Sequence, residues 1–163
     1  MAVELTPKGT RGAQIPRMPR PVMNAVLGLS VGFYRLLGGR VRIRGARLLL
    51  LTTVGARSGK TRRTVLGWFP DGDDAWLVVA SNAGAARHPA WYLNMARNPD
   101  KVWIEVGKRK LEVRPESLKG AEREAAWRRI VAQSPGYAAY QEQTDREIPV
   151  IRLRPAPASP TDE

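Results

Sequence analysis

Short apolar segments paired around tight turns constrain this chain more than any other feature of its sequence. Residues 64–69 and 76–81 form one such pair, and residues 101–106 and 109–113 form another. Each pair is joined by a linker that contains Gly or Asp, which suits the backbone of a hairpin turn. In the second pair apolar and polar side chains alternate, as in a strand with one buried face. The sequence therefore predicts at least two antiparallel hairpins.

Further strands and helices are expected around these hairpins. They are predicted as strands at 41–44, 48–53 and 150–153, helices at 89–97 and 119–133, and a helical turn at 137–140. Six or seven short strands with inserted helices indicate an α+β domain built on a small antiparallel barrel. We assign this barrel domain to residues 39–154, and we expect the Pro-rich residues 155–163 to form a disordered tail.

Residues 1–38 precede the barrel as a basic arm followed by a helix. Residues 1–20 are rich in Pro, Gly and Arg and lack periodicity, so we expect a mobile arm. The next segment predicts an amphipathic helix through the helical spacing of Val22, Val26, Leu29, Phe33 and Leu37. Its uncharged run is too short to span a bilayer. Either the helix packs on the barrel, or residues 17–40 lie on an anionic membrane surface.

Composition narrows the chemistry. The chain has 163 residues, no cysteine and a single histidine, His88. These counts exclude disulfides, thiolate metal sites, cysteine catalysis and multi-histidine metal sites, so no metal is expected. Basic residues exceed acidic ones by 12, and residues 1–63 hold 13 of the 27 Lys and Arg but only one acid, Glu4. An anionic partner of this part of the chain is therefore expected.

The loop at residues 55–63 concentrates four of these cations. It ends in Gly-Lys-Thr, yet only three residues separate Gly55 from Gly59, and a strand follows it. A nucleotide P-loop needs four residues between its glycines and a helix after it, so this loop is not one. Flexible backbone, a Ser58 hydroxyl and clustered cations still suit a bound phosphate. The alternative is a solvated hairpin turn.

Two other segments could form a ligand site. The strand that ends at residues 78–82 finishes in small side chains, which would let a flat ligand approach its backbone. The helix after it carries Trp91 and Asn94, although Trp91 taken alone is more typical of a core residue than of a cofactor contact. Tyr137 and Tyr140 share one helical face, where by themselves they suit packing residues whose hydroxyls reach the rim. His88 precedes a proline at a helix start and suits local structure better than catalysis.

Several linked motifs resemble the deazaflavin (F-420)-dependent nitroreductase and quinone reductase family of actinobacteria. The resemblance covers residues 41–154 in order, and its motifs are Leu-Thr-Thr-Val-Gly-Ala-Arg-Ser-Gly at 51–59, Ser-Asn-Ala-Gly at 81–84, Pro-Ala-Trp-Tyr-Leu-Asn at 89–94, and the pair Tyr137 and Tyr140 followed by Thr-Asp-Arg-Glu-Ile-Pro at 144–149. It implies a split β-barrel related to flavin-binding oxidoreductases. It also implies hydride transfer from the reduced deazaflavin coenzyme F-420 to a quinone, a nitroaromatic compound or a similar conjugated acceptor.

The same resemblance implies roles for individual residues. The residues expected to bind the coenzyme are Arg57, Ser58, Gly59, Lys60, Arg62, Thr64, Val65, Val78, Val79, Ala80, Ser81, Asn82, Trp91 and Asn94. Those expected to face the acceptor, as catalytic residues, are Ser81, Tyr137 and Tyr140. This inventory agrees with the chemistry, because a hydride carrier performs the difficult step and needs no metal or covalent nucleophile from the protein.

Two departures from the family pattern bear on the acceptor. Ser134 stands where the nitroimidazole-activating member has a third tyrosine, and Asn82 stands where that member has a lysine. A quinone is therefore the safer expectation than a nitro drug. An FMN-binding barrel is the main alternative, and nucleic-acid binding is not expected because the aromatic residues are not interleaved with the arginines. The expected location is the cytoplasm, or the inner face of the plasma membrane.

Overall fold

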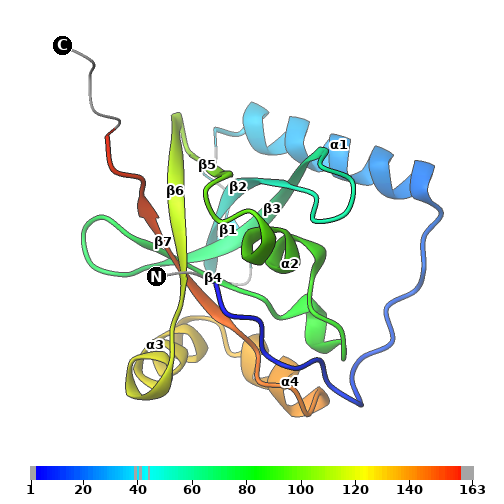
Figure 1. Cartoon of the computed structure of the whole chain (residues 1–163), viewed down its shortest axis with the longest axis vertical. Coiled ribbons are helices and arrows are strands. Elements are labelled where there is room, and N and C mark those ends of the chain that lie inside the picture. Colours follow the sequence, from blue (N-terminus) through cyan, green and yellow to red (C-terminus); the bar gives the residue numbers. More distant parts are fainter. Residues whose placement is uncertain (1–2, 39, 41, 44, 159–163) are drawn as a thin grey trace.

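The fold is an antiparallel barrel of six strands, described by a computed structural model for residues 3–38, 40, 42–43 and 45–158 (Figure 1). The strands follow the order β2-β3-β4-β7-β6-β5, and β5 pairs back with β2 to close the barrel. A short strand β1 extends β2 at the edge. The strands are β1 (Arg42–Ile43), β2 (Ala46–Val54), β3 (Thr61–Pro70), β4 (Trp76–Val79), β5 (Val102–Val106), β6 (Arg109–Ser117) and β7 (Val150–Pro155). The predicted α+β barrel and both predicted hairpins are confirmed.

Side-chain alternation along the strands separates an inner core from an outer one. Leu49, Leu51 and Val78 pack inside the barrel, whereas Leu77 and Val79 join an outer cluster beneath helix α3 (Gly120–Gln133). Strand β4 is thus buried on both faces, which explains its uninterrupted apolar sequence.

The other helices cover the openings and sides of the barrel. They are α1 (Arg20–Leu36), α2 (Ala90–Arg97) and α4 (Gly136–Gln143), and a short 3-10 turn, η1 (Asn82–Gly84), follows β4. The predicted helical turn at 137–140 is a two-turn helix. Helix α2 packs against β2, while α3 and α4 lie together at the lower end in Figure 1.

The prediction that residues 1–20 form a mobile arm is wrong for residues 3–13, which we call the N-terminal arm. Val3 is buried in the barrel core, and the backbone N–H of Gly9 donates to the carbonyl of Ala86 at 2.8 Å. In Figure 1 the blue arm passes the green turn after β4 and the end of α4 before it rises to α1. The segment lacks periodicity because its partners are mainly single backbone groups, which leave no pattern in its side chains.

Helix α1 docks through a face that lies beside its predicted apolar stripe. Tyr34 is buried and its hydroxyl donates to the carbonyl of Glu105 at 2.8 Å, and Arg35 forms an ion pair with the same residue. Leu29 and Phe33 of the stripe are 75% and 60% exposed. The helix therefore packs on the barrel and still presents an apolar face to its surroundings. None of the described helices is long and apolar enough to cross a membrane.

Some expectations fall at or outside the limits of the description. Val41 and Arg44, half of the alternating segment 41–44, lie outside the described residues, as do residues 159–163 of the expected tail. Strand β7 runs through Pro155, and the N–H of Ala156 donates to the carbonyl of Glu112 at 2.9 Å. Ordered pairing therefore continues two residues past the predicted end of the barrel at 154.

Candidate functional site

A groove of about 580 Å³ opens between the loop after β2, the start of β3, and helices α1 and α2; we call it the loop groove. Its lining residues are Arg20, Leu27, Thr53, Gly55, Ala56, Arg57, Ser58, Arg62, Arg63, Thr64, Ala90, Trp91, Leu93 and Asn94. Six predicted coenzyme-binding residues, Arg57, Ser58, Arg62, Thr64, Trp91 and Asn94, are brought together there. Gly59 and Lys60 belong to the same loop but do not line the groove.

The loop at 55–60 is a tight turn held by its own backbone. The N–H of Gly55 donates to the carbonyl of Lys60 at 2.8 Å, and the N–H of Gly59 donates to the carbonyl of Gly55 at 2.9 Å. Gly59 has a φ of +67°, a conformation that glycine adopts without strain. The Ser58 hydroxyl lies so close to Gly55 that a β-carbon there would be only 2.5 Å from it. Both glycines are thus explained by the turn itself.

Asn94 fastens this loop to the barrel. Its side-chain oxygen accepts a hydrogen bond from the N–H of Ala56 at 2.9 Å, and its amide nitrogen donates to the Thr53 hydroxyl at 3.1 Å. Asn94 is 7% exposed, so its amide is committed to protein partners on both sides. It also lines the groove, and its contacts within the protein orient the loop.

The cations of the loop have no competing carboxylates. In the part of the chain that the structure describes, none of Arg57, Lys60, Arg62 and Arg63 forms an ion pair. All four are exposed. Clustered cations next to a glycine-rich turn can bind phosphate or carboxylate groups through charge-assisted hydrogen bonds. The donor set therefore fits an anionic ligand.

A second cavity, of about 370 Å³, also lies along β3; we call it the tyrosine cavity. Val65, Ser134, Tyr137 and Tyr140 line it, whereas Thr64, next to Val65 in the strand, lines the loop groove. Consecutive strand residues point to opposite faces, but Arg63 lies on the same face as Val65 and also lines the loop groove, so the groove and the cavity adjoin along β3. The rings of Tyr137 and Tyr140 meet edge to face with centroids 5.8 Å apart. Both predicted tyrosines thus share one cavity.

The residues at the end of β4 could contact a ligand only through their backbone, unlike the residues of the loop. Val78, Val79 and Ala80 are 0%, 7% and 0% exposed, because their side chains fill the two cores. Strands β3 and β4 are paired only at Phe69–Leu77 and Pro70–Trp76. Beyond these pairs the strands are not in register, so the backbone of 78–80, not its side chains, is what a ligand could contact.

Ser81 and Asn82 begin the turn after β4, which we call the Ser81 turn (residues 81–84). Both are partly buried, and the Asn82 amide donates to the carbonyl of Arg87 at 2.9 Å. Asn82 and Ala83 have φ angles of 44° and 52°, which non-glycine residues rarely adopt. Such local strain tends to collect at functional sites.

Sequence reasoning missed two contributions to this region. Arg20 and Leu27 of α1 line the loop groove, and no periodicity could say where a helix docks. Arg146 is 3% exposed and donates a hydrogen bond to the carbonyl of Ser81 at 2.7 Å. Its signal was its place in the segment 144–149, one of the motifs that carry the family resemblance.

Comparison with known proteins now places the chain. The F420H(2)-dependent quinone reductase family model matches residues 28–155. The F420H(2)-dependent quinone reductase Rv1261c of Mycobacterium tuberculosis is 38% identical over 142 residues, which is 83% of this chain and 94% of that protein.

Solved structures agree with the sequence match. A structure described as an F420-H2 dependent reductase is 39% identical and aligns with a TM-score of 0.59 over 66% of this chain and 93% of the other. A second, described as a domain-swapped dimer, is 34% identical with a TM-score of 0.61 over 80% and 99% of the two chains. The chain therefore belongs to the F420H(2)-dependent quinone reductase family.

Proposed function

We propose that this protein transfers a hydride from reduced coenzyme F-420, bound at the loop groove, to a quinone bound at the tyrosine cavity. One observation carries the proposal: a basic loop groove and an aromatic cavity adjoin along a single strand, β3. Membership of the family supplies the donor and the class of acceptor. The donor would occupy the loop groove and the acceptor the tyrosine cavity.

The donor set fits the coenzyme as the family resemblance describes it, with a phosphate and an acidic tail. Arg57, Ser58 and Arg62 would bind these anionic groups, and Gly59 and Lys60 complete the loop. Its cations are already free of carboxylate partners within the described chain, so binding would break no ion pair that the structure contains. Asn94 would keep the loop in place.

A different set of residues would hold the flat ring. Val65 would contact it where the tyrosine cavity begins, Thr64 would contact it on the side of the loop groove, and the backbone of residues 78–82 would contact it from the end of β4. Trp91 is partly buried against the barrel core and also lines the groove, so it would close the coenzyme side. The buried side chains of Val78 and Ala80 keep this backbone rigid, and a rigid support favours transfer at contact distance.

The protein itself has to supply little covalent chemistry in this reaction. The coenzyme, when bound, supplies a hydride, and a quinone that receives it needs one proton to become a hydroquinone. Ser81, Tyr137 and Tyr140 carry hydroxyls that would donate hydrogen bonds to the acceptor oxygen and stabilise its developing negative charge. Either tyrosine hydroxyl could pass on the proton and be reprotonated from solvent.

Titration of the purified protein with reduced F-420, FMN and NADPH, followed by menadione, tests the proposal. We expect saturable binding of the deazaflavin and its oxidation on adding the quinone, seen as a change in its absorbance. A nitroaromatic compound in the same assay tests the second acceptor class. Tight binding of FMN without binding of F-420 would replace our proposal with the flavin alternative, and failure of several quinones to oxidise the coenzyme would contradict it.

We further propose that α1 places the enzyme on an anionic membrane surface through residues 17–40, on the cytoplasmic face of the plasma membrane. Support comes from five exposed apolar side chains of the helix, namely Val22, Val26, Leu29, Phe33 and Leu36. Exposed arginines at both ends of this segment suit anionic lipid headgroups. A lipid-soluble quinone would be delivered to an enzyme at such a surface.

A further inference from the structure

The Ser81 turn has a backbone that its own sequence does not favour. Asn82, Ala83 and Gly84 have φ angles of 44°, 52° and 79°, and only the last is a glycine. Left-handed backbone is unfavourable for residues with a β-carbon, so the surrounding structure must hold it. Within the turn, the N–H groups of Gly84 and Ala85 donate to the carbonyls of Ser81 and Asn82. These two bonds are few for so strained a turn.

Arg146 makes the additional hydrogen bonds that hold the turn in this conformation. Its guanidinium donates to three backbone carbonyls around the turn, with Nε to Ala85 at 2.8 Å, Nη1 to Ala80 at 3.0 Å and Nη2 to Ser81 at 2.7 Å. These carbonyls stand on both sides of the left-handed residues. The planar fork of the side chain therefore fixes the entry and the exit of the turn in a single geometry.

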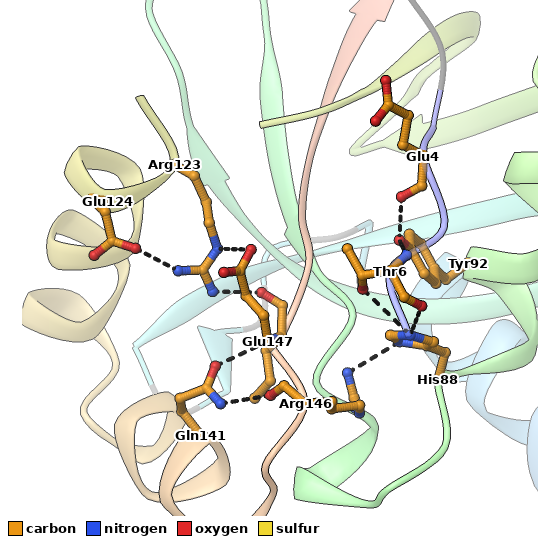
Figure 2. Close-up of polar contacts among 10 residues, drawn as sticks. Glu4, Thr6, His88, Tyr92, Arg123, Glu124, Gln141, Arg146 and Glu147 are labelled. Carbon is orange, nitrogen blue, oxygen red and sulfur yellow. Dashed lines mark hydrogen bonds and ion pairs between the residues drawn. The ribbon is translucent and has the colours of Figure 1, made fainter. Parts of the chain in front are cut away.

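The buried cation has no carboxylate partner in the described chain, and its remaining contact is His88. Nη1 of Arg146 lies 3.2 Å from Nδ1 of His88, and Nε2 of His88 lies 2.8 Å from the carbonyl oxygen of Thr6. A guanidinium can only donate, so Nδ1 accepts and Nε2 carries the proton. Figure 2 shows this chain of contacts from Arg146 through His88 to the N-terminal arm.

The arm is fastened to the same region at two more places. Asp145 accepts hydrogen bonds from the N–H groups of Thr10 at 2.8 Å and Arg11 at 3.1 Å, and from the Thr10 hydroxyl. The N–H of Ala13 donates to the carbonyl of Gly84 at 2.9 Å. The arm thus bonds to the residue before Arg146 and to the last residue of the turn.

A glycine makes this approach possible. A β-carbon at Gly12 would lie 2.6 Å from the carbonyl carbon of Ala85, 2.7 Å from the carbonyl oxygen of Gly84, and still closer to the N–H of Ala86. All three are backbone atoms that cannot move aside without moving the turn. The arm and the turn therefore fit together only with glycine at this position.

We propose that Arg146 is a positioning residue that holds the Ser81 turn in its strained form, and that the N-terminal arm completes the hold. The arm is then part of the active-site framework. The proposal rests on the function proposed above, in which Ser81 faces the acceptor. Loosening the turn would let the Ser81 hydroxyl leave its position without disturbing the loop groove, where the coenzyme phosphate would bind.

The test compares Arg146→Lys with Arg123→Lys. Arg123 is a matched control because it is 5% exposed and donates to the carbonyl of Ile148 at 2.6 Å. Its ion pairs within the described chain are with Glu124 and Glu147 (Figure 2), not with the Ser81 turn. We expect Arg146→Lys to lower kcat with quinone about tenfold and to leave the Kd for F-420 within about twofold. Arg123→Lys should lower the Tm by a similar amount and leave kcat unchanged.

Hydrogen–deuterium exchange supplies a readout besides activity. In Arg146→Lys the amides of Gly84 and Ala85 should exchange faster, whereas Arg123→Lys should leave them protected. Gly12→Ala, which pushes on the turn from the arm, should reproduce both effects of Arg146→Lys and decides the matter if Arg146→Lys does not fold.

The outcomes separate this proposal from the proposed function. Two results would overturn the positioning role. One is unchanged exchange in both Arg146→Lys and Gly12→Ala. The other is faster exchange with unchanged kcat in these variants, while Ser81→Ala does lower kcat. A different result would contradict only the role of Ser81. If Ser81→Ala retains full kcat, and Arg146→Lys still speeds exchange in that background, then Ser81 is not the acceptor-facing residue although Arg146 holds the turn.

Discussion

Gly84 shows at the scale of one residue how the Ser81 turn meets its neighbours. Its φ is +79°, and a β-carbon would lie 3.0 Å from the carbonyl oxygen of Tyr140 and 3.2 Å from the side chain of Gln143. Backbone strain and crowding against α4 both oppose a side chain. We therefore expect Gly84→Ala to lower the free energy of unfolding by about 2–4 kcal/mol in urea titrations.

Gly72 provides the matched control for that variant. It has a similar φ of +70° in the loop between β3 and β4, but a β-carbon there would meet nothing within 4 Å. Gly72→Ala should therefore show only the backbone cost, about 1–2 kcal/mol. Equal losses in the two variants would mean that α4 does not press on the turn.

His88 predicts a pH dependence of stability. Burial lowers the pKa of its imidazole from the ordinary 6.5; the Thr6 carbonyl opposes this, and the charge of Arg146 adds to it. The groups that face the ring are Arg146, Thr6 and the ring of Tyr92, 4.8 Å away. Because the unfolded chain then binds the proton more readily, stability should fall as the pH falls below about 6.5, until the lower folded pKa is passed.

Urea titrations from about pH 8 to about pH 5 would measure this slope. Gln at position 88 can accept from Arg146 and donate to Thr6 without titrating, so His88→Gln should remove the His88 part of the slope. Hydrogen bonds, chiefly from the Thr10 side chain, lower the pKa of Asp145 to about 2, which keeps this carboxylate charged over the same range. An identical slope in wild type and His88→Gln would exclude His88 as its source.

Residue types predicted the loop groove better than they predicted the Ser81 turn. Clustered cations between two glycines indicate an anion site wherever the loop lies, because charge and flexibility are local properties. The hold of Arg146 on Ser81 joins residues 65 positions apart, and the role of His88 depends on both Arg146 and Thr6. Such a contact exists only after the chain has folded, so no spacing rule could supply it.

At the scale of an element, α1 is the part of the fold whose surface is least explained by the barrel. We expect the double variant Leu29→Ser with Phe33→Ser to lose most cosedimentation with anionic phosphatidylglycerol vesicles, because these side chains are 75% and 60% exposed on one face. Turnover of a water-soluble quinone should stay within about twofold of wild type, since neither residue lines a proposed binding cavity.

Leu5→Ser is the control for the membrane variant. Leu5 is 55% exposed on the N-terminal arm, away from α1 in the chain, so its loss should leave vesicle binding unchanged. Raised salt should weaken the binding of wild type, because the flanking arginines are exposed. Vesicle binding that survives the double variant would argue against this face of α1 as the membrane contact.

Local patterns predicted the elements themselves, and topology set their ends. The two hairpins and helices α2 and α3 were foreseen because turn chemistry and periodicity are short-range signals. Strand β6 continues to Ser117, four residues past its predicted end, because its far half pairs with β7. Closure of the barrel by β2 and β5 joins segments about 50 residues apart, and neither segment records its partner.

At the scale of the whole molecule, the basic residues are unevenly distributed along the chain, and folding gathers some of them at one groove. Residues 1–63 contain 13 of the 27 basic residues, and folding brings Arg20 of α1 next to Arg57, Arg62 and Arg63 at one groove. Acidic residues are concentrated later in the chain, where several pair with arginines of β6, β7 and α3. The groove is thus a local excess of positive charge, not a share of a uniform one.

This excess predicts how coenzyme binding responds to salt. We expect the Kd for F-420 to rise at least tenfold between about 50 and about 500 mM NaCl, because screening weakens attraction between exposed cations and an anionic tail. The deazaflavin chromophore alone, without phosphate and tail, should show little dependence. Arg62→Ala should weaken F-420 binding about tenfold at low salt and flatten the dependence.

Arg128→Ala is the control that separates local from global charge. It removes one exposed cation from α3, where the one hydrogen bond of the side chain within the described residues is to the carbonyl of Glu124 in its own helix. If the groove binds the coenzyme, Arg128→Ala should change neither the Kd nor its salt dependence, although net charge falls equally in both variants. If Arg62→Ala and Arg128→Ala changed the Kd and its salt dependence equally, the coenzyme would be responding to the overall charge of +12. That result would contradict the loop groove as the anion site.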